Sequence, residues 1–198
     1  MHCRGMNSMR NIIVALTLLL LEACTYTTPR YNYWPDTTEA IKKANASGVY
    51  VEPFTRTASI DTGCNVTAGT LALPDGLSYE GYIQDALVRE LKKADAYDSA
   101  SPKVMLSGVV EQLSIFADRN IYTSTWDINL RIKSSNGESA LIRTSYDFQV
   151  NYSVKDRIPS PFTDCQTIAD AYMSAVQQVV YQLVHSPDFK YLVKPKSD

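Results

Sequence analysis

The sequence predicts an α+β fold, a two-layer sandwich in which two helices cover one face of a mostly antiparallel four-stranded sheet. Segments 78–97 and 163–184 carry apolar residues at spacings of three and four, which is typical of amphipathic helices. Three later segments are predicted strands, and the last two of them alternate apolar and polar residues, as strands with one buried and one wet face do. These segments are 104–116, 126–133 and 142–152. With a first strand at 48–54, the predicted order is β, α, β, β, β, α.

The turn between the last two strands follows from their alternation. A two-residue loop would pair Arg131 with Ile142 and set a solvent-facing residue against a core residue. A three-residue loop at 135–137 instead pairs Leu130 with Ile142, with Gly137 in the left-handed conformation. The sequence therefore predicts the three-residue loop.

Smaller features complete the predicted fold. The helix at 78–97 allows strand 48–54 to pair parallel with a later strand, because it can form the crossover. Gly108 marks either a β-bulge or a close approach of another segment. Asp36 can cap a short helix that reaches Ala46. The apolar residues of segment 189–193 are expected to pin the end of the chain to the domain.

The N-terminal residues have the pattern of an export signal. The apolar run 12–21 follows Arg10 and has ten residues, whereas a membrane-spanning helix needs about 20. The next residues, Leu21-Glu22-Ala23-Cys24, resemble the lipobox of bacterial lipoproteins, which implies cleavage before Cys24 and a lipid on its thiol. Glu22 departs from the usual small or apolar residue, so secretion with another cleavage site is the alternative.

This resemblance implies a domain organisation and a location. The expected parts are a signal peptide at 1–23, the lipidated cysteine and a tether at 24–47, and one periplasmic α+β domain at 48–198. In such lipoproteins an aspartate after the cysteine favours the inner membrane. Because Thr25 stands there, the resemblance implies a lipid-anchored protein of the outer membrane that faces the periplasm.

Two cysteines remain once the signal is removed and Cys24 is modified. Cys64 and Cys165 would then meet in an oxidising compartment, where an isolated pair is a candidate disulfide. Closing a loop of about 100 residues would stabilise the fold by roughly 4 to 5 kcal/mol in the chain-entropy model. We expect the Cys64–Cys165 disulfide, with two buried free thiols as the alternative.

The tether is rich in aromatic residues. Such rings join an apolar face to a polar tip, so they could meet lipid headgroups, a sugar or a protein partner. Tyr31, Tyr33 and Trp34 are the candidate partner contacts. We nevertheless expect an extended segment that folds back on the domain, with partner contact as the alternative.

The sequence offers little for catalysis. His185 is the only histidine after the signal, and its place at a helix end favours a structural role. The chain has no HExxH, CxxC, glycine-rich phosphate loop or GxSxG motif, so we expect no catalytic residues, no metal and no cofactor. Residues 1–23 carry two of the 19 Lys and Arg and one of the 21 Asp and Glu, which leaves a charge near −3 and gives no indication of nucleic-acid binding.

The region from Val104 to Val184 resembles the small outer-membrane lipoproteins of the YajG type. The resemblance lies in three segments, Val104–Val110, Ile128–Gly137 and Ile168–Ala171. LptE, the plug of the lipopolysaccharide translocon, is similar in layout. The resemblance implies a location at the outer membrane and a fold, but no catalysed reaction.

The hypothesis is therefore a non-catalytic, membrane-anchored lipoprotein that acts as an envelope binding or accessory module. Its partners would be the membrane, through the covalent lipid, and another envelope protein or a cell-wall component. A periplasmic enzyme of an unrecognised class is the alternative.

Overall fold

The structure is a computed structural model that describes residues 25–57, 59–60, 70–118, 123–149 and 161–196. No helix within these ranges is long and apolar enough to cross a membrane. The elements, in chain order, are β1 (Thr25–Thr27), α2 (Pro35–Lys43), β2 (Val49–Val51), β3 (Thr55–Arg56), β4 (Thr70–Ala72), the 3-10 turn η1 (Pro74–Gly76), α3 (Tyr79–Lys93), β5 (Val104–Asp118), β6 (Thr123–Ser134), β7 (Ser139–Gln149), α4 (Pro161–His185) and α5 (Phe189–Leu192).

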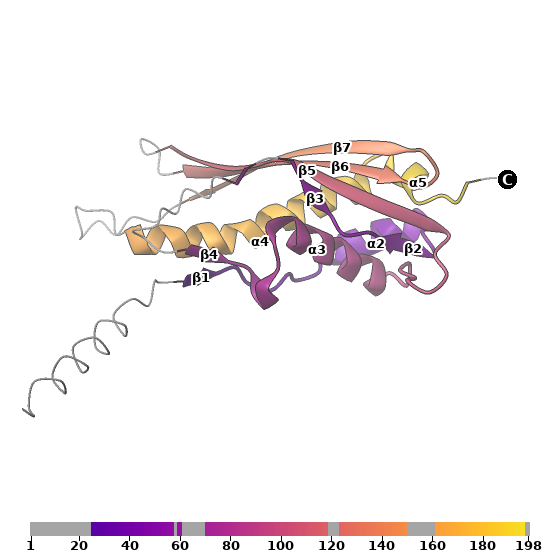
Figure 1. Cartoon of the computed structure of the whole chain (residues 1–198), viewed down its shortest axis with the longest axis horizontal. Coiled ribbons are helices and arrows are strands. Elements are labelled where there is room, and N and C mark those ends of the chain that lie inside the picture. The colour runs from indigo at the N-terminus through magenta and orange to yellow at the C-terminus, as the bar shows by residue number, and fades with distance from the viewer. Residues whose placement is uncertain (1–24, 58, 61–69, 119–122, 150–160, 197–198) are drawn as a thin grey trace, which may run out of the picture.

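The main sheet forms one layer, and α2, α3 and α4 form the other (Figure 1). The fold is the predicted α+β sandwich, but the sheet has five strands and not four. Its path is β2-β5-β6-β7, and β3 also pairs with β5. The fifth strand arises because the chain, after Pro53 interrupts β2, pairs again with β5 at Thr55 and Arg56. Both β2 and β3 run parallel to β5, as the crossover through α3 allows.

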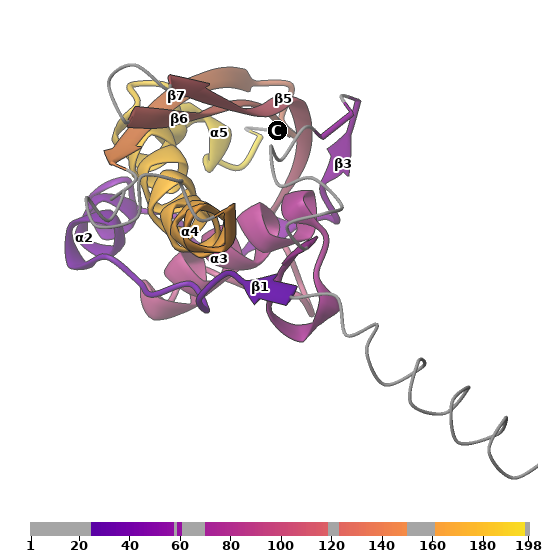
Figure 2. The same cartoon turned by 90° about the vertical axis from the view of Figure 1, so that its left-hand side faces the viewer.

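A second, two-stranded sheet lies on the far side of the helices from the main sheet (Figure 2). It consists of β1 and β4, which pair in parallel from Thr25 opposite Thr70 to Thr27 opposite Ala72. Neither strand was predicted, because three residues are too few to carry a recognisable alternation. This small sheet fixes the start of the described chain to the helical layer.

The predicted register of β6 and β7 is confirmed. Leu130 lies opposite Ile142, and Asn129 lies opposite Arg143. Gly137 has a φ of +99°, in the region that favours glycine. The inward residues of β6 are consequently buried against the helices, and the outward residues face solvent.

At Gly108 the Phe54 ring approaches β5 closely, which is one of the two predicted roles of this glycine. The β-bulge, the other predicted role, lies further along β5. The register with β6 shifts between Val110 and Gln112, so Glu111 is the extra residue. A Cβ atom at position 108 would lie 2.6 Å from ring carbon Cδ1 of Phe54. Phe54 packs on β5 at the gap between β2 and β3, so Gly108 admits its ring.

Helix boundaries differ from the prediction by a few residues. Ser78 caps α3 by accepting a hydrogen bond from the Gly81 amide, but the helix ends at Lys93 because Asp95 has a φ of +57°. The fourth helix begins at Pro161 rather than at residue 163 or 164, since proline is tolerated in a first turn. The cap of α2 is Trp34, not Asp36, and its side chain makes no capping bond.

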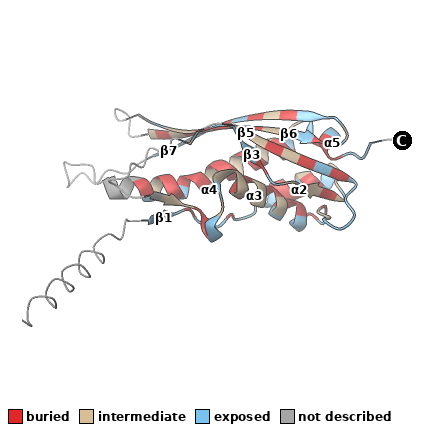
Figure 3. Ribbon diagram, in the orientation of Figure 1, coloured by how far each residue is buried: buried red, intermediate tan, exposed pale blue. Residues whose placement is uncertain are grey.

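Buried residues line the interface between sheet and helices (Figure 3). At its centre the Tyr172 ring packs against Trp126 and Tyr82, with centroids 5.0 and 5.6 Å away. The polar atoms of these rings are bonded: Trp126 Nε1 donates to the Ile168 carbonyl, and the Tyr172 hydroxyl donates to the Tyr79 carbonyl. As expected, the end of the chain is pinned by buried Phe189, Leu192 and Val193.

The contact at Gly108 yields a stability prediction. We expect Gly108→Ala to lower the free energy of unfolding by about 1 to 3 kcal/mol, because the new methyl group overlaps the Phe54 ring. In a Phe54→Ala background the same substitution should cost much less. Urea unfolding of the four proteins measures both values, and an equal cost in the two backgrounds would contradict the contact.

Candidate functional site

The N-terminal segment, residues 25–34, folds back on the domain, which is one of the two alternatives for the aromatic tether. After β1, the amide of Thr28 donates to the Ala72 carbonyl. The Tyr82 hydroxyl of α3 donates to the Pro29 carbonyl over 2.8 Å. The segment then crosses α3 and enters α2 at Pro35.

A buried carboxyl group holds this segment in place. Glu90 lies on α3 with none of its surface exposed, and it accepts three hydrogen bonds from the N-terminal region. Its Oε1 accepts from the Tyr31 hydroxyl and from the Trp34 amide, each over 2.8 Å, and its Oε2 accepts from Thr38 Oγ1 over 3.0 Å. We call Glu90, Tyr31, Trp34 and Thr38 the Glu90 clamp.

The Glu90 clamp both caps α2 and holds the N-terminal segment on α3. Through the Trp34 amide, Glu90 caps the N-terminus of α2, which explains how that helix starts without a cap from its own side chains. Through Tyr31 and Thr38 it joins the residues on either side of that cap. Burial and the neighbouring Glu90 carboxyl raise the pKa of Tyr31 far above its ordinary value of 10.0, so the phenol stays a hydrogen-bond donor.

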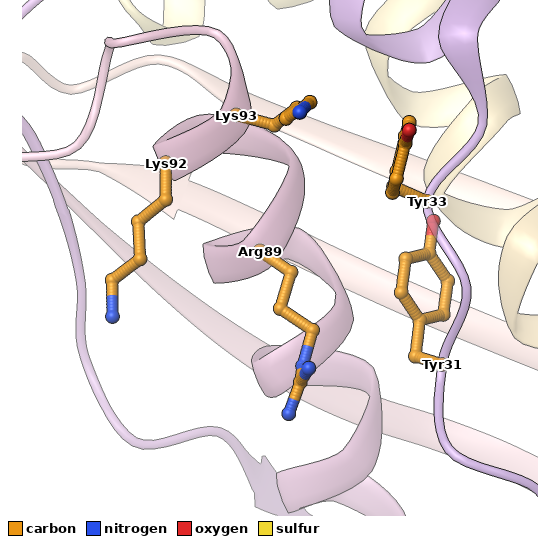
Figure 4. A pocket seen from close by; sticks show the side chains of 5 residues that line it. All are labelled: Tyr31, Tyr33, Arg89, Lys92 and Lys93. Atoms are coloured by element: carbon orange, nitrogen blue, oxygen red, sulfur yellow. The ribbon is translucent and has the colours of Figure 1, made fainter.

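A pocket opens beside the clamp, between the N-terminal segment and the last turns of α3 (Figure 4). We call it the tyrosine–lysine pocket; it is an open concavity with a volume of about 350 Å³. Its lining residues are Tyr31, Tyr33, Arg89, Lys92 and Lys93. Lys93 reaches toward Tyr33, whereas Lys92 points away from both tyrosines (Figure 4).

The cations of the pocket are held in different ways. The Lys93 ammonium lies 4.9 Å from the centre of the Tyr33 ring, and the Lys92 ammonium lies 5.1 Å from that of Tyr97. Arg89 is ion-paired with Asp85 one turn earlier on α3. Within the described part of the chain, neither Lys92 nor Lys93 forms an ion pair with a carboxylate.

Aromatic side chains also bridge the N-terminal segment and α4. The Trp34 ring lies 5.3 Å from that of Tyr181, which stacks on His185 at 3.9 Å. Gln177 of α4 donates to the Asn32 carbonyl. His185 thus contributes to packing at the end of α4, where the sequence favoured a structural role.

The outward face of the main sheet is polar, and its side chains bond one another. Glu111 at the bulge forms an ion pair with Arg131, which holds the pKa of that carboxyl below its ordinary value. Further along the same face, Ser145 donates to Asp127. Glu111, Arg131 and Asp127 therefore all have bonding partners within this face.

The predicted site residues have different outcomes. Tyr31, one of the three candidate partner contacts, is buried in the clamp with 6% of its surface exposed, and its hydroxyl is bonded to Glu90, so it offers a partner no more than the edge that lines the pocket. Tyr33 and Trp34 remain exposed, at 48% and 39%. Cys24 lies outside the described residues, and lipidation stays a prediction. The described ranges contain no group of three His, Cys, Asp or Glu side chains that could hold a metal ion.

Cys165 is buried in α4 and is disulfide-bonded. Cys64, the expected partner, lies outside the described residues. The Cys64–Cys165 pairing therefore stays a prediction.

Sequence reasoning missed the central residue of the site. Glu90 lies three residues after Leu87 and four after Ala86, so it falls on the buried stripe of α3. A carboxyl group in an otherwise apolar stripe signals a buried polar contact, because an unpaired one would be costly. That signal was present in the sequence, although the identity of the donors was not.

The solved structures named below are similar to this chain at low sequence identity. No family model matches the sequence, and no curated protein is detectably similar to it. A protein from Xanthomonas campestris of the DUF330 family is 14% identical, with a TM-score of 0.47 over 85% of this chain and 97% of its own. A hypothetical protein from Chlamydia trachomatis is 10% identical, with a TM-score of 0.41 over 70% of this chain and 96% of its own. The resemblance to the YajG and LptE types stays a prediction.

The clamp can be tested with neighbouring tyrosines. We expect Tyr31→Phe to lower the free energy of unfolding by about 1 to 3 kcal/mol, because the buried Glu90 carboxyl loses a donor. Tyr33→Phe is the matched control and should change it by less than about 0.5 kcal/mol, since Tyr33 is half exposed. Chemical denaturation measures both; equal effects would argue against the clamp.

The buried tyrosines make a pH prediction. Burial raises the pKa of Tyr79 to about 12, and it raises the pKa values of Tyr31, Tyr82 and Tyr172 further. The pKa values of these tyrosines in the folded protein exceed the value near 10 of an unfolded chain. Their contribution to the free energy of unfolding is therefore complete below pH 10 and is lost as the pH rises through the folded-state pKa values. In an alkaline titration followed at 295 nm, about four of the 13 tyrosines should ionise only as the fold is lost. Ionisation of all 13 near pH 10 in folded protein would refute this.

Proposed function

We propose that this protein is a non-catalytic lipoprotein, anchored through Cys24 to the outer membrane and facing the periplasm. Its domain acts there as a binding or accessory module for another envelope protein or a cell-wall component. One observation carries the proposal: the lipobox-like cysteine comes directly before Thr25, the first residue of β1.

The position of Thr25 would make the attachment short. Thr25 pairs with Thr70, and successive Cα atoms are about 3.8 Å apart, so a lipid on Cys24 would be joined to the fold without a long spacer. The start of α4 lies at the same end of the molecule as β1, and the C-terminus lies at the other end (Figure 1). The proposed anchor thus directs one end of the sandwich toward the bilayer.

The chemistry around the described carboxyl groups supports a binding role over catalysis. Glu90 is the most deeply buried of the described acids, and its oxygens already accept three hydrogen bonds. Its contacts are those of a structural residue. The accessible concavity beside it, the tyrosine–lysine pocket, presents cations and aromatic rings instead of paired acids and bases.

The anchor is tested by metabolic labelling. Cells producing the full chain are grown with radiolabelled palmitate, and the protein should carry the label in the outer-membrane fraction. A Cys24→Ala variant should carry none, because the thiol that takes the lipid is gone. Wild-type protein without label, or equal label on the variant, would overturn the proposal.

A further inference from the structure

We propose that the tyrosine–lysine pocket binds a phosphate group, carried by a soluble molecule or by a lipid headgroup. The site belongs to the folded domain and does not depend on the lipid at Cys24. It would give the envelope module a ligand of defined chemistry.

Positively charged side chains are concentrated in the last two turns of α3. Arg89, Lys92 and Lys93 lie at i, i+3 and i+4 on α3, which brings them to neighbouring positions on one side of the helix. The whole chain has a formal charge of −2, so this grouping does not follow from composition. Arg89 is paired with Asp85 and Lys92 points away from the tyrosines, so the Lys93 ammonium and the guanidinium donors of Arg89 that do not bond Asp85 are the positive charge that an anion in the pocket would meet (Figure 4).

Helix α2 provides a comparison for the lysines at the end of α3. Lysines in the last turn of a helix are stabilised by the negative end of the helix dipole. This effect alone could explain why Lys92 and Lys93 stand at the end of α3. Helix α2 ends with the same pair, Lys42 and Lys43, but they line no part of the tyrosine–lysine pocket. What distinguishes α3 is Arg89 one turn earlier and the wall of tyrosines opposite.

The size and the lining of the tyrosine–lysine pocket also suit a phosphate group. A volume of about 350 Å³ lies at the lower end of the range for small-molecule sites. The Glu90 clamp fixes Tyr31 as one wall, and Tyr33 holds the Lys93 ammonium beside the opening. The Asp85 contact of Arg89 engages Nε, and a guanidinium has further donors in a geometry that suits phosphate oxygens.

The test uses the full-length protein in a neutral detergent. Calorimetry with inorganic phosphate should detect binding to the wild type. The double variant Arg89→Gln/Lys93→Gln should bind at least about tenfold more weakly, because it loses two charge-assisted contacts. The matched control, Lys42→Gln/Lys43→Gln, removes the same number of charges from the end of α2 and should bind phosphate as the wild type does.

A second arm distinguishes the two sources of phosphate. The same proteins are mixed with phosphatidylcholine vesicles that contain or lack phosphatidylglycerol, and co-sedimentation is measured. Phosphatidylglycerol-dependent sedimentation that the pocket variant loses identifies a lipid headgroup; phosphate binding without it identifies a soluble ligand. Binding in neither arm, or equal weakening in the pocket variant and the α2 control, would overturn the proposal.

Discussion

The structure depends on one buried carboxyl group. Glu90 is enclosed by protein, and its oxygens accept hydrogen bonds from two side chains and one backbone amide of the N-terminal region. A carboxyl group without such partners would be too costly to bury in a helix that packs on the core. The N-terminal segment and α3 therefore require each other: the segment supplies donors, and the helix supplies the acceptor that orders it.

This constraint links the proposed anchor to the proposed ligand site. The chain runs from Thr25 in β1 past the Pro29 contact to Tyr31 and Trp34, so it is attached to the domain at several points. The same attachment places Tyr33 opposite Lys93 and completes the tyrosine–lysine pocket. A change that released the segment would therefore loosen the path from Cys24 to the core and also remove one wall of the pocket.

The elements with a periodic pattern of apolar residues could be predicted from the sequence. The alternation in β6 and β7 determined both faces and the register, because a one-residue slip would expose the core. The parts that depend on single long-range contacts could not. Strand β3 pairs with β5 after the interruption at Pro53, and it has only two residues. Strand β1 pairs with β4, which lies 45 residues further along the chain, and each has three residues. The sequence predicted that the segment of Tyr31 folds back on the domain, but it did not predict the hydrogen bond to Glu90, because Glu90 lies 59 residues further along the chain.

The Trp34 amide offers the most direct test of the Glu90 clamp. Native-state hydrogen exchange, resolved by NMR, measures how often this N–H leaves the Glu90 carboxyl. The clamp predicts exchange at least about a thousandfold slower than in an unstructured peptide, a protection of roughly 4 kcal/mol. Exchange of the Trp34 amide at the rate of an unstructured peptide, while the amides of α3 remain protected, would contradict the account.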